Sequence, residues 1–448
     1  MKKACLFLFT VVVSLVSGAQ QKNPLPNKQQ LAWHDMEYYW FIHFGPNTFT
    51  DKEWGHGDET EDIFNPTALD CRQWARIAKQ AGAKGIIITA KHHDGFCLWP
   101  SKYSTHTVRE SKWKNGKGDV VGDLMKACKE YGLKFGVYLS PWDRNHPKYG
   151  TADYNNVYVN TMTELITRYG PFFEFWWDGA NGEGPNGKKQ VYDFKRFEKV
   201  MRKLAPNTVV FSDIGPDIRW VGNESGFAGT TNWNYLDTAG FTRGAGGPSQ
   251  DTLNQGNING KNWIPAECDV SIRPGWFYHK EEDDKVKTAE QLFNLYLKSV
   301  GRGSTLLLNI PPDRRGLINE IDSAALVDFR KLREVNLSKP IASKIFAVSA
   351  QPVSLNYTLK LGKTSSVNCV ILKEAIQLGQ NVKSFTVKLM KNNELVKEVT
   401  ATTIGHKRIL TFPAVEADAI EVAITDSKAK PVISELQAYL IDESLVEK

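Results

Sequence analysis

Residues 172–179 have the sequence FFEFWWDG, and this short segment does most to decide the fold. It follows a helical pattern that ends at Gly170 and precedes a loop rich in Gly, Asn and Pro. A short, almost continuously apolar run in this setting is typical of a buried strand in a parallel sheet. Asp178 stands where the strand enters its loop, and α/β barrels carry their catalytic groups at such strand ends. Because Asp-Gly is also a common turn pair, the segment alone leaves a turn-forming role for Asp178 equally open.

Units of an apolar strand followed by an amphipathic helix recur on both sides of this segment. Strands are predicted at residues 40–45, 84–94, 135–142, 172–178, 208–213, 218–224, 264–273 and 304–310. Helices are predicted at residues 31–39, 70–82, 119–132, 157–170, 191–204, 288–300 and 323–337. Successive strand–helix units predict a parallel sheet with right-handed crossovers, which is either doubly wound or closed into a barrel.

Two observations favour the barrel. The Gly-rich phosphate loop of a dinucleotide fold is missing after the first strand. The strands also end in polar or aromatic side chains, and a barrel gathers all its strand ends around one mouth; these side chains are His43, His92, His93, Asp94, Tyr138, Asp178 and Asp213. We therefore predict an α/β fold, a (β/α)8-like TIM barrel, for residues 20–337.

The character of the chain changes near residue 338. Helical periodicity gives way to short alternating segments such as 384–389 and 419–424, separated by turn signals. This pattern is typical of a small all-β sandwich, which we predict for residues 338–448.

The first nineteen residues are predicted to be a signal peptide (1–19). Lys2 and Lys3 precede an apolar core at residues 6–16 and the small residues 17–19. We expect an exported protein, periplasmic or secreted, and no membrane-spanning segment, because this core is too short to span and no later stretch is apolar enough. The formal net charge of +6 is spread over mixed charges, so we expect no nucleic-acid partner.

The cysteines and histidines do not form a recognisable metal-binding pattern. The six Cys show no CxxC spacing, which argues against a disulfide framework or a zinc site and leaves one isolated bridge open. His92 and His93 are adjacent, and neighbouring residues of a strand face opposite ways. Residues 42–44 offer only His43, so the H-x-H pair of barrel metallohydrolases is absent. We expect neither a metal nor another cofactor, and each histidine alone could equally be structural.

Two carboxylates at strand ends could together cut a glycosidic bond. Asp178 could attack the anomeric carbon, while Glu224 protonates the leaving oxygen and then activates water. Retention of configuration needs carboxyl groups roughly 5 Å apart, against about 6.5–9.5 Å for inversion, and the sequence does not give this distance. Other side chains could hold the sugar ring by hydrogen bonds or by packing against it: His43, His92, His93, Tyr138, Arg273, Trp54, Trp176 and Trp276.

Four motifs in this order resemble the α-L-fucosidases of glycoside hydrolase family 29. They are WFIHFG at residues 40–45, KHHDGF at 91–96, GVYLSPW at 136–142 and FWWDG at 175–179. The resemblance spans about residues 31–337. It implies a retaining mechanism with Asp178 as nucleophile. It also implies that His43, His92, His93, Tyr138 and Trp176 contact fucose, and, through the segment SIRPGWFY at 271–278, Arg273 and Trp276.

The family resemblance also suggests an acid/base residue and a linkage. The segment GPDIRWVGNE at residues 215–224 resembles the branch that prefers α-1,3/1,4-linked fucose on branched, Lewis-type glycans. In that branch the Glu of VGNE is the acid/base, which implies Glu224, with Glu267 as the fallback and Asp213 as a weaker third. The C-terminal β-sandwich resembles an accessory, galactose-binding-type domain. The expected partner is a fucosylated oligosaccharide or glycan.

Three alternatives remain open on the sequence. The chain could be a catalytically silent fucose-binding protein, although it carries both carboxylates. It could be an α-L-fucosidase of broad linkage specificity. It could also be a metal-dependent barrel hydrolase, which metal analysis would test.

Overall fold

Eight parallel strands form a closed barrel in the computed structural model, which describes residues 23–348 and 354–447. They are hydrogen-bonded in the order β1-β10-β9-β6-β5-β4-β3-β2. Their bounds are β1 (Tyr38–Ile42), β2 (Gly85–Lys91), β3 (Lys134–Leu139), β4 (Glu174–Trp176), β5 (Val209–Ser212), β6 (Ile218–Trp220), β9 (Ala266–Ser271) and β10 (Thr305–Asn309). Each lies within or overlaps a predicted strand, and closure confirms the barrel over the doubly wound sheet.

Alternation along the strands divides the apolar side chains between two layers, because successive residues of a strand face opposite ways. On β1, Tyr39 and Phe41 point into the barrel, where they join Trp176 and Phe211. Trp40 and Ile42 point outward and pack in the layer under the helices. Both layers exclude water, so the strand ends are held on a rigid scaffold.

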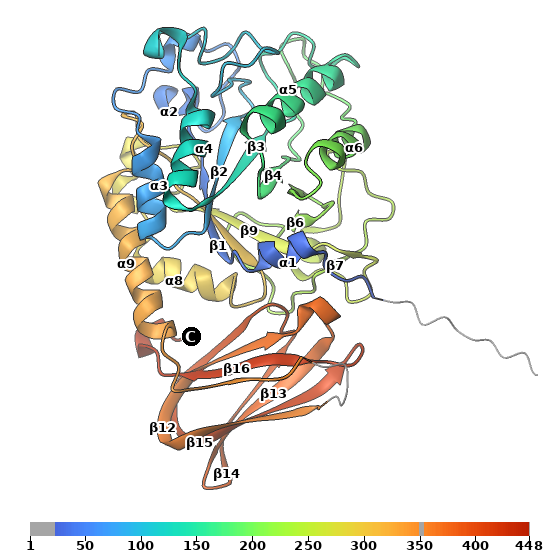
Figure 1. The fold of residues 1–448 in the computed structure, drawn as a ribbon, viewed down its shortest axis with the longest axis vertical. Coiled ribbons are helices and arrows are strands. Elements are labelled where there is room, and N and C mark those ends of the chain that lie inside the picture. The colour runs from blue at the N-terminus through green and yellow to red at the C-terminus, as the bar shows by residue number, and fades with distance from the viewer. Residues whose placement is uncertain (1–22, 349–353, 448) are drawn as a thin grey trace, which may run out of the picture.

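Helices surround the barrel (Figure 1), and local caps fix where they begin and end. Asp70 accepts a hydrogen bond from the Arg72 backbone at the start of α3, and Gly132 ends α4 in the left-handed conformation. The α-helices are α1 (Lys28–His34), α2 (Pro46–Thr50), α3 (Cys71–Gln80), α4 (Val120–Tyr131), α5 (Tyr154–Tyr169), α6 (Phe194–Leu204), α7 (Gln250–Gln255), α8 (Ala289–Lys298) and α9 (Glu320–Leu337). The 3-10 helices are η1 (Glu61–Ile63), η2 (Trp113–Gly116), η3 (Lys280–Lys285), η4 (Ile376–Leu378) and η5 (Glu443–Leu445).

The predicted first helix is shifted. Residues 38 and 39, which fell in the helix predicted at 31–39, begin β1 instead, and α1 ends at His34. Tyr38 and Tyr39 are aromatic, and both are buried against neighbouring strands. The Gly-rich insertion between β6 and β9 contains α7 and a two-stranded antiparallel ribbon, β7 (Tyr235–Leu236) with β8 (Asn262–Trp263).

The C-terminal part is all-β, as predicted. One sheet runs in the order β11-β16-β12-β15-β13-β14. Its strands are β11 (Ala342–Ile345), β12 (Asn356–Glu374), β13 (Val382–Lys391), β14 (Glu394–Thr402), β15 (Arg408–Ser427) and β16 (Ile433–Tyr439). The pairing of β12 with β15 contains register shifts, and such bulges bend long strands so that one sheet can enclose its own core.

This sheet packs at the end of the barrel where the strands begin (Figure 1). Glu37, immediately before β1, forms an ion pair with Lys407 at 2.5 Å. Arg302 pairs with Glu447 at 2.8 Å, and the Asn234 backbone donates to the Gln380 side chain at 2.7 Å. The sheet therefore lies opposite the mouth formed by the C-terminal strand ends.

The predicted signal peptide lies outside the described residues. Among the residues that the structure describes, no helix is long and apolar enough to cross a membrane. The cysteines at 71, 97, 128, 268 and 369 are buried and free.

Candidate active site

A cavity of about 130 Å³ lies at the C-terminal ends of the barrel strands. This volume falls below the roughly 300–1,000 Å³ of pockets for drug-sized ligands, so it suits a single small ring. The predicted site residues line it, with the exception of Arg273. The lining comprises Phe41, His43, Glu53, Trp54, His92, His93, Tyr138, Trp176, Asp178, Ala180, Glu224, Asp269 and Trp276. These residues include carboxylates, imidazoles and aromatic rings, and neither Lys nor Arg is among them.

Asp178 is held in place by two donors just beyond the end of β4. Its Oδ1 accepts a hydrogen bond from the Ala180 backbone at 2.7 Å, and its Oδ2 accepts one from the Tyr138 hydroxyl at 2.9 Å. The side chain retains 24% exposure, so the carboxylate is fixed but reachable from the cavity. The turn also requires Gly179, because a Cβ there would approach both carboxylate oxygens of Asp213 to 2.1 Å.

His43 and His93 have their ring orientation fixed from outside the cavity. The Ser140 hydroxyl donates to the Trp142 carbonyl at 2.8 Å, so it must accept from His93 Nδ1, which lies 2.8 Å away. In the same way His43 Nδ1 donates to Asn309 Oδ1 at 2.9 Å. Both rings then carry their proton on Nδ1. His43 presents Nε2 as an acceptor, while His93 Nε2 lies 3.6 Å from Asp178 Oδ2.

Burial keeps these imidazoles uncharged. It lowers the pKa of His43 to about 3 and that of His93 to about 4. Burial also lowers the pKa of His92 well below its usual range, and the neighbouring His93 and His43 lower it further. Neutral imidazoles of this kind can accept hydrogen bonds from hydroxyl groups.

Trp176 and Trp276 supply aromatic walls. The Trp176 ring stacks on Phe211 with centroids 3.8 Å apart, and its indole N–H donates to Glu267 Oε1 at 2.8 Å. The indole N–H of Trp276 donates to Glu224 Oε2 at 3.2 Å. Glu224 is exposed at the cavity, in the loop that follows β6, and thus lies where a leaving group could depart.

Glu53 orders the loop that carries Trp276, and sequence reasoning missed it. Its carboxylate accepts from the backbone of Trp276 at 2.7 Å and of Phe277 at 3.1 Å. It also bonds His279 Nε2 at 2.7 Å, and His279 Nδ1 bonds Asp51 at 2.8 Å. Burial alone lowers the pKa of His279, but these two carboxylate bonds outweigh it and raise the pKa. We call Glu53, His279 and Asp51 the loop clamp.

Asp269 also lines the cavity and was not predicted. It follows Glu267 by two residues on β9, so both side chains point into the barrel, but Asp269 lies nearer the mouth. Burial raises its pKa well above the usual range, and repulsion by Glu224 and Glu267 adds to this. Its Oδ1 accepts from the Trp220 indole at 2.9 Å. The sequence could have indicated Asp269, because residues two apart on a strand face the same way. If Glu267 points into the barrel, Asp269 does too.

The two fallback carboxyls do not line the cavity. Glu267 is fully buried and bonded to Tyr39 and Trp176, which places it below the cavity floor. Asp213 lies against Gly179, and burial with the nearby Asp178 raises its pKa to about 6.

The structure does not bring Arg273 to the sugar cavity. Its guanidinium is 0% exposed and forms ion pairs with Asp322 at 2.8 Å and with Asp283 at 3.0 Å. The expectation that Arg273 contacts substrate fails, because a buried guanidinium needs carboxylate partners and finds them behind the loop. Arg273 instead anchors the segment that carries Trp276.

Within residues 23–348 and 354–447, no three His, Cys, Asp or Glu side chains are grouped as metal ligands. His92 Nδ1 is buried and has no partner in the described part of the chain. The cavity thus combines reachable carboxylates, Asp178 and Glu224 among them, with neutral acceptors and aromatic walls, which is chemistry suited to cleaving a bond at a hydroxylated ring.

Comparison with known proteins points to one family. A family model described as alpha-L-fucosidase matches residues 23–336. The Arabidopsis thaliana protein "Alpha-L-fucosidase 1" is 41% identical over 450 residues, covering 93% of this chain and 88% of the relative. A crystal structure of a glycoside hydrolase 29 family member from an unknown rumen bacterium has a TM-score of 0.87 and 43% identity, covering 94% of this chain and 78% of that one. A Ruminococcus gnavus GH29 fucosidase in complex with fucose has a TM-score of 0.83 and 28% identity, covering 95% and 96%.

Proposed function

This chain belongs to the α-L-fucosidase family, glycoside hydrolase family 29, and we propose that it releases terminal L-fucose with retention of configuration. The observation that carries the proposal is the shared cavity of Asp178 and Glu224. One carboxylate is fixed by Tyr138 and Ala180, and the other is exposed at the rim.

In the proposed mechanism Asp178 acts as the nucleophile and Glu224 as the acid/base. An Asp178 oxygen attacks the anomeric carbon, while Glu224 gives its proton to the leaving glycosidic oxygen. Water then attacks the same carbon and gives its proton to Glu224, and the bond to Asp178 breaks. The Tyr138 hydroxyl and the Ala180 backbone each donate to one oxygen of Asp178 and hold the carboxylate at the cavity. The neutral histidines accept bonds from the sugar hydroxyls, and Trp176 and Trp276 pack on its apolar face.

Replacing the nucleophile tests the first step. We expect Asp178→Asn to lower kcat by about a thousandfold or more, because an amide cannot form the glycosyl intermediate. Asp213→Asn is the matched control, since that carboxyl is adjacent but does not line the cavity. Steady-state kinetics on an aryl α-L-fucoside, with thermal unfolding to check the fold, measure both. Activity of Asp178→Asn close to that of the wild type would reject the assignment.

Replacing the acid/base tests the second role. We expect Glu224→Ala to slow substrates with poor leaving groups by about a hundredfold or more, while activated aryl fucosides suffer less. Azide should restore turnover and yield the fucosyl azide with retained configuration. An unchanged rate would transfer the role to one of the other carboxyls that line the cavity, Asp269 or Glu53, and Asp269→Asn or Glu53→Gln would then show the loss.

We propose that the preferred substrate is α-1,3/1,4-linked fucose on branched, Lewis-type glycans, on the strength of the segment at 215–224. Product analysis with three substrates tests this linkage: a Lewis-type trisaccharide, a linear α-1,2-fucosylated trisaccharide and an aryl α-L-fucoside. Release from the branched substrate alone supports the proposal. Release of fucose from all three substrates, fastest from the aryl fucoside, would contradict the proposed linkage preference and still support the fucosidase assignment.

We further propose that the chain is exported after cleavage following residue 19. N-terminal sequencing of the protein recovered from a bacterial host tests this. A chain that retains Met1 and stays in the cytoplasm would contradict it.

A further inference from the structure

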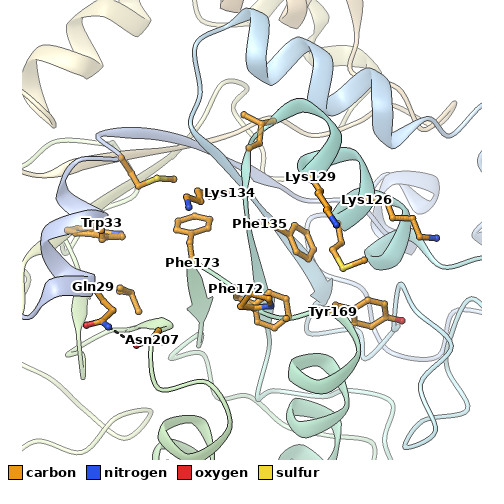
Figure 2. Close-up of a pocket in the computed structure, with 17 residues that line it drawn as sticks. Gln29, Trp33, Lys126, Lys129, Lys134, Phe135, Tyr169, Phe172, Phe173 and Asn207 are labelled. Carbon is orange, nitrogen blue, oxygen red and sulfur yellow. Dashed lines mark hydrogen bonds between the residues drawn. The ribbon is translucent and has the colours of Figure 1, made fainter.

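A second, larger cavity lies at the opposite end of the barrel, where the strands begin (Figure 2). Its volume is about 730 Å³, within the roughly 300–1,000 Å³ typical of ligand pockets. Figure 2 shows Gln29 and Trp33 projecting from α1 and Lys126 and Lys129 from α4, with the rings of Phe172 and Phe173 between the two helices. We call this cavity the basal groove. None of its lining residues lines the sugar cavity.

The walls of the basal groove are mostly apolar and recessed. Trp33, Phe135 and Phe172 line it, yet their exposed fractions are only 2%, 7% and 4%. The large rings therefore form the floor of a concavity and do not protrude from the surface. A surface that inserts into a membrane presents its large apolar side chains outward, so this shape fits a single enclosed molecule better than a lipid bilayer.

The charge of the basal groove has one sign. Lys126, Lys129 and Lys134 line it, and no Asp or Glu does. These three lysines are exposed and form no ion pair with any described residue. The acidic residues of α4 are engaged elsewhere, since Asp123 pairs with Lys114 at 3.3 Å and Glu130 pairs with Arg72 at 2.5 Å. The basal groove thus combines an apolar floor with uncompensated ammonium groups.

We propose that the basal groove binds a monomeric amphiphilic carboxylate, an anion with an extended apolar body. The body would lie on the aromatic floor, and the carboxylate would accept hydrogen bonds from the lysines. At one end of the groove the Gln29 amide donates to Asn207 Oδ1 at 2.7 Å, so these two amides bind each other, and the lysines are the cationic groups available to the anion. A highly hydroxylated ligand such as a sugar would find few partners on this floor.

Binding of dodecanoate to the full-length enzyme tests the proposal. Isothermal titration calorimetry below the critical micelle concentration should give saturable binding at one site per chain. The triple variant Lys126→Glu, Lys129→Glu, Lys134→Glu should weaken this binding by about tenfold or more, because charge-assisted hydrogen bonds are lost. Ala32→Trp, which adds a large ring to the lining on α1, should block the basal groove and abolish binding.

The matched control reverses three exposed lysines of α6, which do not line the basal groove: Lys195→Glu, Lys199→Glu and Lys203→Glu. This control changes the net charge of the protein by the same amount as the groove variant. It should bind dodecanoate as the wild type does. Thermal unfolding checks that every variant folds.

Four binding results would overturn the proposal. They are no binding of dodecanoate, equal binding of dodecanol, equal weakening by the α6 variant, and binding only to anionic phospholipid vesicles. A dimer in analytical ultracentrifugation that Ala32→Trp dissociates would also overturn it, because the groove would then be an interface between copies. The assay does not use turnover, so its result is independent of the fucosidase mechanism.

Discussion

At the scale of single residues, the most unusual feature is a pair of buried glutamates beneath the sugar cavity. Glu174 and Glu267 are both 0% exposed; they contact each other, and their other partners are neutral donors. Trp33 donates to Glu174 at 3.0 Å, while Tyr39 and Trp176 donate to Glu267. Burial raises the pKa of both carboxyls, and the charge of Glu267 raises that of Glu174 further.

This pair predicts a specific pH dependence of stability. A carboxyl whose pKa is raised by folding stabilises the protein fully below its unfolded pKa of about 4.3, and this contribution is lost as pH rises through the folded pKa. Glu174→Gln has no carboxyl to ionise at this position, so we expect it not to show this loss. Relative to the wild type, its free energy of unfolding should rise by about 1 kcal/mol per pH unit between the unfolded and the folded pKa of Glu174. Urea unfolding at a series of pH values measures the difference.

The matched control for this prediction is Glu164→Gln. Glu164 also accepts from an indole, that of Trp99 at 3.0 Å, but it pairs with Arg168 at 3.4 Å. Its substitution should lower stability around neutral pH, because the ion pair with the partly exposed Arg168 is broken. If Glu174→Gln behaves in the same way, the raised pKa is not the cause.

At the scale of elements, the sequence predicted the strands well and the loops poorly. Each barrel strand has a local signature, because an apolar run ends in a polar or aromatic side chain, as at His43 and Asp178. Closure into a barrel has no local signature and was inferred only from those strand ends.

Arg273 was misplaced because its partner Asp322 lies 49 residues away. Glu53 was missed because its function depends on the backbone of a loop distant in sequence.

The loop clamp predicts an effect on catalysis from a residue that need not touch the leaving group. Glu53→Ala removes the acceptor for the Trp276 and Phe277 backbone, so Trp276 should lose its fixed position beside Glu224. We expect kcat/KM to fall by about tenfold to a hundredfold, since small misplacements of positioning groups are costly. Steady-state kinetics with the exposed Asp58→Ala as control measures this. Kinetics of Glu53→Ala equal to those of Asp58→Ala would show that Trp276 is held by other contacts.

At the scale of the whole molecule, an apolar cluster joins the barrel to the C-terminal sheet, which also has a core of its own. Cys369, Ile371 and Ile409 of the sheet belong to the same buried cluster as Leu295 and Val300 near the barrel. The Ile409 backbone also donates to the Gly301 carbonyl at 2.9 Å. The interface ion pairs, such as Glu37 with Lys407, lie around this apolar contact. A shared core of this kind couples the unfolding of the two parts.

We therefore expect one cooperative unfolding transition in calorimetry, although the chain has two architectures. Ile409→Ala should lower the free energy of unfolding by about 2–5 kcal/mol and shift the whole transition to lower temperature, because it opens a cavity in the shared core. Val387→Ala is the control, since Val387 is buried in the separate core of the sheet. If the parts are coupled, both variants shift the same single transition. If Val387→Ala instead produces a separate early transition while the barrel melts unchanged, the sheet folds on its own and the shared core does not hold the molecule together.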